Sequence, residues 1–369
     1  MALIDFNSEQ KLIQGEVRKF SQTELEPVAS DIDKNGVFPV EIIKKLSDLG
    51  LSSLIIPEKF NGAALDTTSL CIVLEELAKQ CASISTILAV NNCLVAFPIM
   101  NYASEQIKEY YLKKLAQGEI GAYSVDLGID VPDTKISVTE TDGACLVSGK
   151  YDFVLNGETA HFFILPVSFT NGKALYLCEE TAGIQKIKHH ILGMRAAGII
   201  GFEYKDLRLK GDKCLLSIDK ATQALKKMQD YSNIGFSAIS LGIAEAALDA
   251  SVKYSKERKQ FGRAICEFPM VQEMLVDMKT RIEAARFLVY DAAKKCDKAQ
   301  DYTLSANIAR LISSEAAVFS GTTAIQVHGG YGYIKDYPVE RFLRDAKTIQ
   351  VLQEPPYELK SKIAKELLS

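Results

Sequence analysis

The strongest constraint on the fold is a change in residue pattern that occurs twice along the chain. Over residues 1–119 apolar side chains recur at helical spacing, as at Leu12, Ile13 and Val17. Residues 120–218 contain short β-rich runs separated by turn signals, and helical spacing returns over residues 219–369. Strands and helices segregated along a chain are typical of α+β folds. The pattern therefore predicts a mostly α, α+β protein with an N-terminal helical domain (1–119), a middle antiparallel β domain (120–218) and a C-terminal helical domain (219–369).

The C-terminal domain is expected to be a four-helix bundle. Apolar stripes follow residues 234–254, 270–297 and 302–327, and residues 357–368 add a short last helix. Long helices joined by short links pack as antiparallel neighbours around a shared apolar seam. Methionines on these stripes are interpreted as core packing rather than as ligands.

Two segments have glycines where a helix would otherwise continue. Gly329, Gly330 and Gly332 interrupt a helix expected from Ser313 to Val327, and Gly262 closes a charged helix end at Arg258. Glycine permits positive φ and a close approach of backbone to a ligand, and the freed amides can hold an anion. A guanidinium suits a phosphate because it donates forked, charge-assisted hydrogen bonds. On spacing alone, the first segment is equally well explained as an ordinary helix connection, and the second is better explained as a charged helix end closed by a C-cap glycine.

Composition excludes several classes of function. The net charge of −4 favours neither nucleic acid nor an acidic membrane surface as a partner. Eight cysteines occur without a CxxC pair and only four histidines are present, so no metal site is expected. The adjacent His189 and His190 are interpreted as structural or solvent-facing. Free thiols suit a reducing cytoplasm. The sequence has no uninterrupted run of 18 apolar residues, so no membrane span is expected.

Several strings of residues together resemble the acyl-CoA dehydrogenase flavoprotein family over essentially the whole length. The most specific are AIQVHGGYGYIKDYPVERFLRDAK (324–347) and ERKQFG (257–262). IPEKFNGAALD (56–66), near the N-terminus, resembles the same family. The resemblance implies FAD as cofactor, bound in part by a neighbouring subunit, and hence a homo-oligomer, usually a dimer of dimers. It assigns to that cofactor six residues of the C-terminal domain: Arg258, Gln260, Phe261, Gln326, Gly329 and Gly330.

The middle domain departs from the family pattern where the flavin ring is expected. The family's LTEPxAGSD aligns with residues 122–130, which puts Tyr123 at the threonine that contacts the flavin. The family's W-I-T-N-G becomes Phe153-Val154-Leu155-Asn156-Gly157. Phe153 can still stack on a flavin ring, whereas Leu155 cannot donate the hydrogen bond that the family's threonine makes near N5.

The family's catalytic base is missing as well. Counted from the RDAK motif, the position of the glutamate that removes the α-proton holds Gln353, and a carboxamide has no useful basicity. At the alternative base position of some members stands Ser232, with Asn233 in place of the usual arginine. Glu354 is a candidate replacement if the local register shifts by one residue. Asp230 and Asp126 are other carboxylates nearby in sequence, and all three acids are better explained as solvated loop acids.

The resemblance therefore implies a divergent FAD-dependent acyl-thioester dehydrogenase, with hydride transfer between the acyl β-carbon and flavin N5. The altered contacts favour an unusual substrate, such as an acyl group on a carrier protein instead of CoA, and electron-transferring flavoprotein is the family's usual redox partner. Alternatives are an enoyl-thioester reductase and a catalytically silent flavin-binding scaffold subunit. A flavin monooxygenase on the same fold is a fourth alternative.

Overall fold

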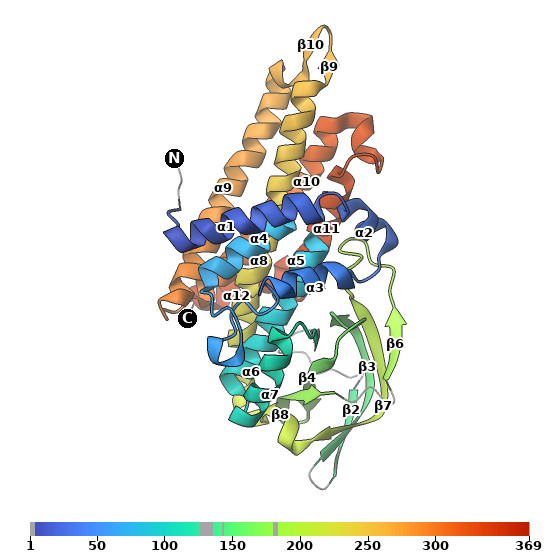
Figure 1. Ribbon diagram of the computed structural model, residues 1–369, viewed down its shortest axis with the longest axis vertical. Coiled ribbons are helices and arrows are strands. Elements are labelled where there is room, and N and C mark those ends of the chain that lie inside the picture. Colours follow the sequence, from blue (N-terminus) through green and yellow to red (C-terminus); the bar gives the residue numbers. More distant parts are fainter. Residues whose placement is uncertain (1–3, 126–135, 142–143, 180–183, 369) are drawn as a thin grey trace.

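A computed structural model describes residues 4–125, 136–141, 144–179 and 184–368, and it has helices at both ends of the chain and a sheet between them (Figure 1). The predicted α+β class is thereby confirmed, whereas the domain limits at residues 119 and 218 stay a prediction. The helices of the first part are α1 (Ser8–Phe20), α2 (Ala29–Asn35), α3 (Val40–Asp48), α4 (Thr67–Ala78), α5 (Ala82–Ala89), α6 (Phe97–Tyr102) and α7 (Glu105–Ala116). Those of the last part are α8 (Ile218–Glu257), α9 (Pro269–Asp297), α10 (Thr303–His328), α11 (Val339–Val351) and α12 (Pro356–Leu368).

Side-chain caps set where three of the N-terminal helices begin. The Asn7 side chain accepts from the Gln10 amide at 2.8 Å, which completes a capping box at the start of α1. Asp66 and Ser104 accept in the same way from the third residue of α4 and α7. A cap satisfies one of the backbone amides that a helix start leaves free, so these boundaries follow from local sequence.

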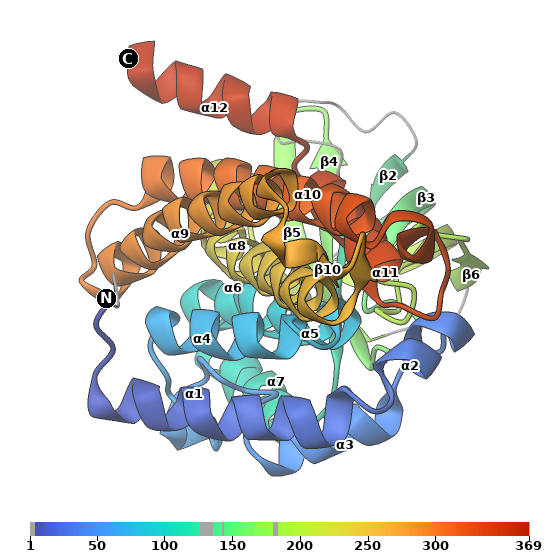
Figure 2. The ribbon, with the colours of Figure 1, turned by 90° about the horizontal axis from the view of Figure 1, so that it is seen from above.

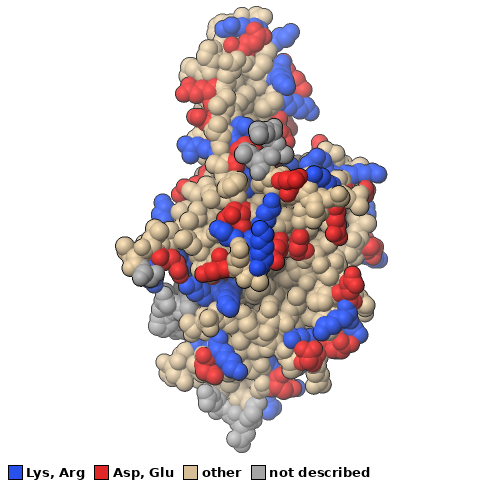
Figure 3. Space-filling view, turned by 90° about the vertical axis from the view of Figure 1, so that its left-hand side faces the viewer, with Lys and Arg blue, Asp and Glu red and all other residues tan. Residues whose placement is uncertain are grey.

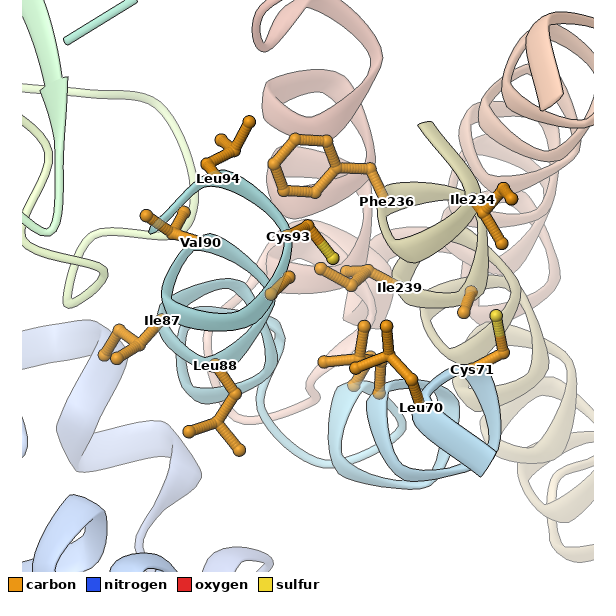
Figure 4. Packing of buried hydrophobic residues seen from close by; sticks show 14 of the residues in the cluster. Leu70, Cys71, Ile87, Leu88, Val90, Cys93, Leu94, Ile234, Phe236 and Ile239 are labelled. Atoms are coloured by element: carbon orange, nitrogen blue, oxygen red, sulfur yellow. The ribbon is translucent and has the colours of Figure 1, made fainter. Parts of the chain in front are cut away.

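The largest core lies where α4, α5 and α8 meet. Figure 4 shows Leu70, Cys93, Phe236 and Ile239 pointing toward one another from α4, from the π-helical segment Val90–Ala96 that follows α5, and from α8. All four are fully buried. α4 is buried on every side, since it lies between α1 and the C-terminal helices (Figure 2).

By length and composition, two helical stretches, Ala82–Tyr102 and Ile218–Glu257, could cross a membrane. Their apolar windows are 89% and 83% buried inside the protein. Core helices of soluble proteins pass the same test, so these stretches are weak evidence for a membrane span.

The middle part is one sheet whose strand order is β6-β7-β3-β1-β4-β5-β8, with β2 paired to β3. Its neighbours are antiparallel apart from β1 and β4, which run parallel, so the predicted antiparallel domain is a mixed sheet. One of the turn signals that separate the β-rich runs of the sequence is Asp-Gly at 142–143, and it lies outside the described residues. The strands are β1 (Gly121–Ser124), β2 (Ile136–Thr141), β3 (Ala144–Leu155), β4 (Phe162–Phe169), β5 (Gly172–Cys178), β6 (Ile184–Lys188), β7 (Ile200–Lys210) and β8 (Cys214–Leu216).

A register shift between Tyr151 and Val154, where β3 pairs with β7, changes which way the side chains of β3 face. Tyr151 and Val154 both pack in the core of the sheet, although strict alternation would separate them. Leu155 instead joins the core of the helices, and Phe153 is 42% exposed. An irregularity of this kind inserts a residue and re-aims its neighbours.

In the C-terminal part, α8, α9, α10 and α11 pack together, and a short hairpin of β9 (Lys259–Gln260) and β10 (Arg263–Ala264) joins α8 to α9. The hairpin stands at the end of the molecule opposite the sheet (Figure 1). Seen from above, α12 leaves the bundle and lies along its outer side (Figure 2). Opposite charges are interspersed on the face in Figure 3, without a large block of one sign.

Asp297 at the end of α9 ties the bundle to the N-terminal helices. Its carboxylate accepts from the Thr67 amide at 2.6 Å, and from the Thr68 amide at 3.0 Å and hydroxyl at 2.6 Å. An acid at a helix N-terminus also interacts favourably with the helix dipole.

We expect Asp297→Ala to lower the free energy of unfolding by about 1–2 kcal/mol, because it removes a cap from α4. Urea unfolding followed by circular dichroism measures the change. Asp291→Ala, on the same helix, is the control. It breaks an exposed ion pair with Lys295 and should change the free energy of unfolding by less than about 0.5 kcal/mol. Equal effects of the two variants would contradict a specific role for the Asp297 cap.

Candidate active site

A cavity of about 740 Å³ lies between the sheet and the C-terminal helices. β3, residues 189–192, α11 and the start of α12 line it, mostly with apolar side chains. Its aromatic and polar members include Phe153, His189, Lys347, Gln353 and Glu358. An apolar cavity of this size with a few polar groups is typical of a small-molecule or cofactor site. Glu358 is the one acid among its described lining residues, and it accepts from the Tyr357 hydroxyl at 2.9 Å.

Phe153 presents its ring to this cavity because of the β3 irregularity. The His189 ring lies 5.6 Å from the Phe153 ring, and His189 Nε2 is 2.8 Å from the Asp152 carbonyl oxygen. His189 thus supports the aromatic wall, which agrees with a structural role for it. Sequence reasoning did not anticipate that both His189 and His190 line a cavity.

The RDAK motif holds the loop after β6 against α11. Met194 N donates to Asp345 Oδ1 at 2.5 Å, and Gly193 N donates to Thr348 Oγ1 at 3.0 Å. A Cβ on Gly193 would lie 2.3 Å from the Arg344 carbonyl oxygen, so only glycine allows this approach. Burial raises the pKa of Asp345 to about 6, and the Met194 amide opposes that shift. Arg344 and Asp345 are not among the residues that line the cavity, whereas Lys347 of the same motif and Thr348 are.

Gln353, at the position of the family's base, lines the cavity from the link between α11 and α12. Its φ of +70° lies in the left-handed region, which is unusual for a residue with a side chain. Ser232 Oγ donates to Gln353 Oε1 at 3.1 Å and is also 2.8 Å from the Gln229 carbonyl oxygen. Ser232 and Gln353 are therefore brought together, as the family's two base positions would be, and neither is a base.

Glu354 points away from the cavity, into the bundle. Its side chain is fully buried, Asn233 Nδ2 donates to Oε2 at 2.6 Å, and Lys362 forms an ion pair with Oε1. The one-residue register shift that would make Glu354 a replacement base is not what the structure has. A catalytic role for Glu354 stays a prediction that its surroundings weigh against.

Asp230 continues the same polar network toward α10. Asn307 Nδ2 donates to Asp230 Oδ1 at 3.3 Å, and Asn233 Nδ2 is 3.1 Å from Asn307 Oδ1. Burial raises the pKa of Asp230 to about 6. Burial also lowers the pKa of Arg310 to about 10, with Glu354 opposing the shift, so Arg310 stays charged at neutral pH. Asp230 is not a solvated acid, and it is not among the residues that line the cavity.

The other two middle-domain positions are closed to the cavity. Tyr123 on β1 pairs with Leu155 on β3, and both side chains are buried against the helices. Of the three predicted flavin contacts in this domain, only Phe153 is accessible. The positions 126–130, including Asp126, lie outside the described residues.

A second cavity, of about 590 Å³, gathers several of the residues predicted to reach a neighbour's cofactor. Arg258, Gln260, Gly329 and Gly330 line it, and the Arg258 guanidinium lies 5.5 Å from the Tyr331 ring centre. Gly329 has φ +59°, and a Cβ at Gly329 or Gly330 would meet no atom within 4 Å. Both glycines therefore leave open space beside the backbone instead of serving internal packing.

Two predicted residues of this group lie outside that cavity. Phe261 projects from the hairpin with 94% of its side chain exposed, and Gln326 is exposed on α10. The second cavity shares no lining residue with the cavity at Phe153, and the hairpin stands at the end of the molecule opposite the sheet to which β3 belongs (Figure 1). One chain therefore does not bring all the predicted cofactor residues to one place. Among the described residues, no three His, Cys, Asp or Glu side chains gather as metal ligands.

Known proteins are similar to this chain in both sequence and fold. Residues 7–119 match the family model of the acyl-CoA dehydrogenase N-terminal domain, and residues 223–353 match that of the C-terminal domain. The short-chain specific acyl-CoA dehydrogenase of Clostridium acetobutylicum is 35% identical over 99% of both chains. The acryloyl-CoA reductase (NADH) of Anaerotignum propionicum is 33% identical over 100% of this chain and 97% of its own.

Solved structures agree closely. Butyryl-CoA dehydrogenase of Megasphaera elsdenii superposes with a TM-score of 0.94 at 31% identity, over 99% of this chain and 100% of the other. A chain described with the electron transferring flavoprotein of Acidaminococcus fermentans gives 0.94 at 30% identity, over 99% and 100%. A prolyl acyl carrier protein oxidase gives 0.93 at 26% identity, over 98% and 100%. With both end domains matched and relatives at this identity over nearly their full length, the chain belongs to the acyl-CoA dehydrogenase family.

Proposed function

We propose that the protein is an FAD-dependent oxidoreductase that acts at the α,β carbon–carbon bond of acyl thioesters. The observation that carries this proposal is the 740 Å³ cavity, where the Phe153 ring and residue 353 line a single space in a chain of this family. The aromatic ring offers a stacking surface, and position 353 is where the family removes or returns the α-proton.

The residues present fit an FAD whose binding site is shared by two chains. Phe153 offers a ring that one face of an isoalloxazine can stack on. Arg258, beside the open turn at Gly329 and Gly330, offers a guanidinium and free space suited to a pyrophosphate. When bound, FAD supplies the two-electron redox chemistry at N5.

The chain's own residues can orient the thioester, but the group that would accept its α-proton is not the glutamate that the family uses. Gln353 offers a carboxamide, which can hydrogen-bond a thioester but cannot accept its α-proton. Glu358 is the carboxylate at the cavity that remains for that task. Tyr123 and Leu155 stand where the family has threonines at the flavin, and these departures favour a substrate outside the common straight-chain acyl-CoAs.

Reduction of an enoyl thioester is a second candidate. Gln353 can donate a hydrogen bond to a thioester carbonyl, and such a bond polarises the double bond for hydride addition. The acryloyl-CoA reductase among the relatives supports this direction. The prolyl acyl carrier protein oxidase supports a carrier-bound substrate as an alternative to CoA.

The proposal extends to partners and location. We propose a homo-oligomer, a dimer of dimers, because the Arg258 and Phe153 cavities are separate in one chain and share no lining residue. Electron-transferring flavoprotein is the proposed redox partner, in line with the Acidaminococcus fermentans structure. The eight free cysteines support a reducing cytoplasm. The alternative is a scaffold subunit that binds flavin without turnover, and the following experiment distinguishes it from an active enzyme.

We expect the purified protein to be yellow and to hold FAD. Anaerobic mixing with acyl-CoAs should bleach the flavin absorbance if it dehydrogenates, and enoyl-CoAs should restore the colour of the reduced protein if it reduces. The same acyl groups on a carrier protein test the carrier. A colourless protein that takes up no added FAD would refute the cofactor proposal. Bound FAD that no thioester reduces or oxidises would favour the scaffold.

A further inference from the structure

The side chain of Glu354 is held at both carboxylate oxygens, directly beside Gln353. Oε2 accepts from Asn233 on α8 at 2.6 Å, and Oε1 is ion-paired with Lys362 on α12. Lys362 Nζ also donates to Gln229 Oε1 on α8 at 2.7 Å. Charge-assisted hydrogen bonds inside a protein are strong, since little water competes for them. Glu354 therefore joins the α11–α12 link to two helices at once.

The backbone on the other side of Gln353 is held too. Arg310 Nη2, on α10, donates to the carbonyl oxygens of Ile349 and of Leu352, the latter at 3.2 Å. The Glu354 amide donates to the Leu352 carbonyl at 2.8 Å. A cation against the last carbonyls of α11 also interacts favourably with the helix dipole. Residues 352 and 354 are thus fixed by three helices, and residue 353 lies between them.

Gln353 adopts a conformation that it would not prefer in a free link. Its φ of +70° is in the region that side-chain-bearing residues seldom adopt. Backbone of this kind persists only where the surrounding structure over-determines it. In this conformation consecutive side chains separate: residue 353 lines the cavity and residue 354 enters the bundle.

We propose that Glu354 is a positioning residue: through Asn233 and Lys362 it holds residue 353 in the left-handed conformation that directs its side chain into the cavity. The functional part of this statement rests on the proposed function, because it takes the cavity as the active site. The effect of Glu354 on the backbone conformation of residue 353 does not depend on that function. Glu354 has both oxygens engaged away from the cavity, and its role is to set where residue 353 meets a substrate.

Two variants remove this attachment, and two serve as controls. Glu354→Gln keeps the shape and removes the charge, while Lys362→Met removes the cation from a less buried site. Lys362→Arg keeps a cation and should restore the behaviour of the unaltered protein. Glu75→Gln is the matched control, because Glu75 is equally buried between Arg286 and the Tyr290 hydroxyl at 2.7 Å and does not line the cavity.

The first measurement is hydrogen exchange of the peptide covering residues 350–358 in the purified protein. Glu354→Gln and Lys362→Met should speed exchange of the amides of residues 352–354 by about tenfold or more, since local opening becomes easier. Glu75→Gln and Lys362→Arg should leave this peptide unchanged. Unchanged exchange in both Glu354→Gln and Lys362→Met would overturn the proposal, whether or not a flavin is bound.

The second measurement places Glu354→Gln in a Gln353→Glu background. A misplacement of about 1 Å can cost about 10²-fold in rate, so kcat for a short acyl-CoA should fall by that order with KM little changed. Glu75→Gln in the same background should lower thermal stability without this loss of kcat. An unchanged kcat would overturn the positioning role. If no variant binds flavin, the proposed function fails, and the exchange measurement alone decides whether Glu354 holds residue 353.

Discussion

Gln353→Glu is expected to raise α,β-dehydrogenation of a short acyl-CoA by about 10²–10⁴-fold, the usual contribution of a positioned general base. That range corresponds to a barrier lower by about 3–5 kcal/mol. The substitution changes an amide to a carboxylate at nearly the same volume, on a side chain that already lines the cavity. Partial burial there should raise the carboxyl pKa toward neutrality, which suits a base. Anaerobic flavin bleaching with butyryl-CoA measures the rate.

Two further variants identify the group that acts in the unaltered protein. If Glu358 accepts the α-proton, Glu358→Gln should abolish wild-type bleaching but leave most of the activity gained by Gln353→Glu. If a register shift makes Glu354 the base, Glu354→Gln should abolish wild-type activity while Gln353→Glu adds little. The geometry favours the first outcome, because Glu358 lines the cavity and Glu354 does not. No change in any variant with any thioester would remove base chemistry at this link from the proposed function.

Arg258→Ala is expected to weaken FAD binding by about 10- to 150-fold, since a hydrogen bond to a charged group contributes about 1.5–3 kcal/mol. Titration of the flavin-free protein with FAD, followed by fluorescence, measures the dissociation constant. Arg263→Ala is the matched control. Arg263 lies on the same hairpin, with its guanidinium 4.1 Å from the Phe268 ring centre, and it does not line the Arg258 cavity. Equal losses from both variants would indicate damage to the hairpin instead of a lost phosphate contact.

Mixing two defective variants tests whether each flavin site is built from two chains. Arg258→Ala and Phe153→Ser should each bind FAD poorly alone. Subunits that are dissociated together and reassembled should recover about one quarter of the sites, because a mixed two-fold dimer has one site with both native residues. No recovery in verified mixed oligomers would contradict a composite site. A monomer in light scattering with FAD fully bound would contradict the oligomer itself.

The sequence determined the secondary structure well where the determinants are local. Helices α4 and α7 begin at the side-chain caps of Asp66 and Ser104, and such a cap acts within three residues of itself. The helix before Gly329 ends at His328, because Gly329 takes a positive φ. The family strings at Arg258 and Gly329 also identified residues that the fold gathers in one cavity, although Phe261 and Gln326 lie outside it.

Only the tertiary structure decided which of the remaining candidates face a ligand. Alternation along β3 groups Phe153 with Tyr151 and Leu155, yet the irregular pairing with β7 exposes Phe153 alone. Gln353 and Glu354 are neighbours in sequence, and contacts from α8, α10 and α12 send one to the cavity and the other into the bundle. Glu358 was missed because nothing in its own neighbourhood marks it as a cavity residue. A side chain's direction at a bulge or in a link depends on partners about 50 to 120 residues away. The local sequence does not specify those contacts.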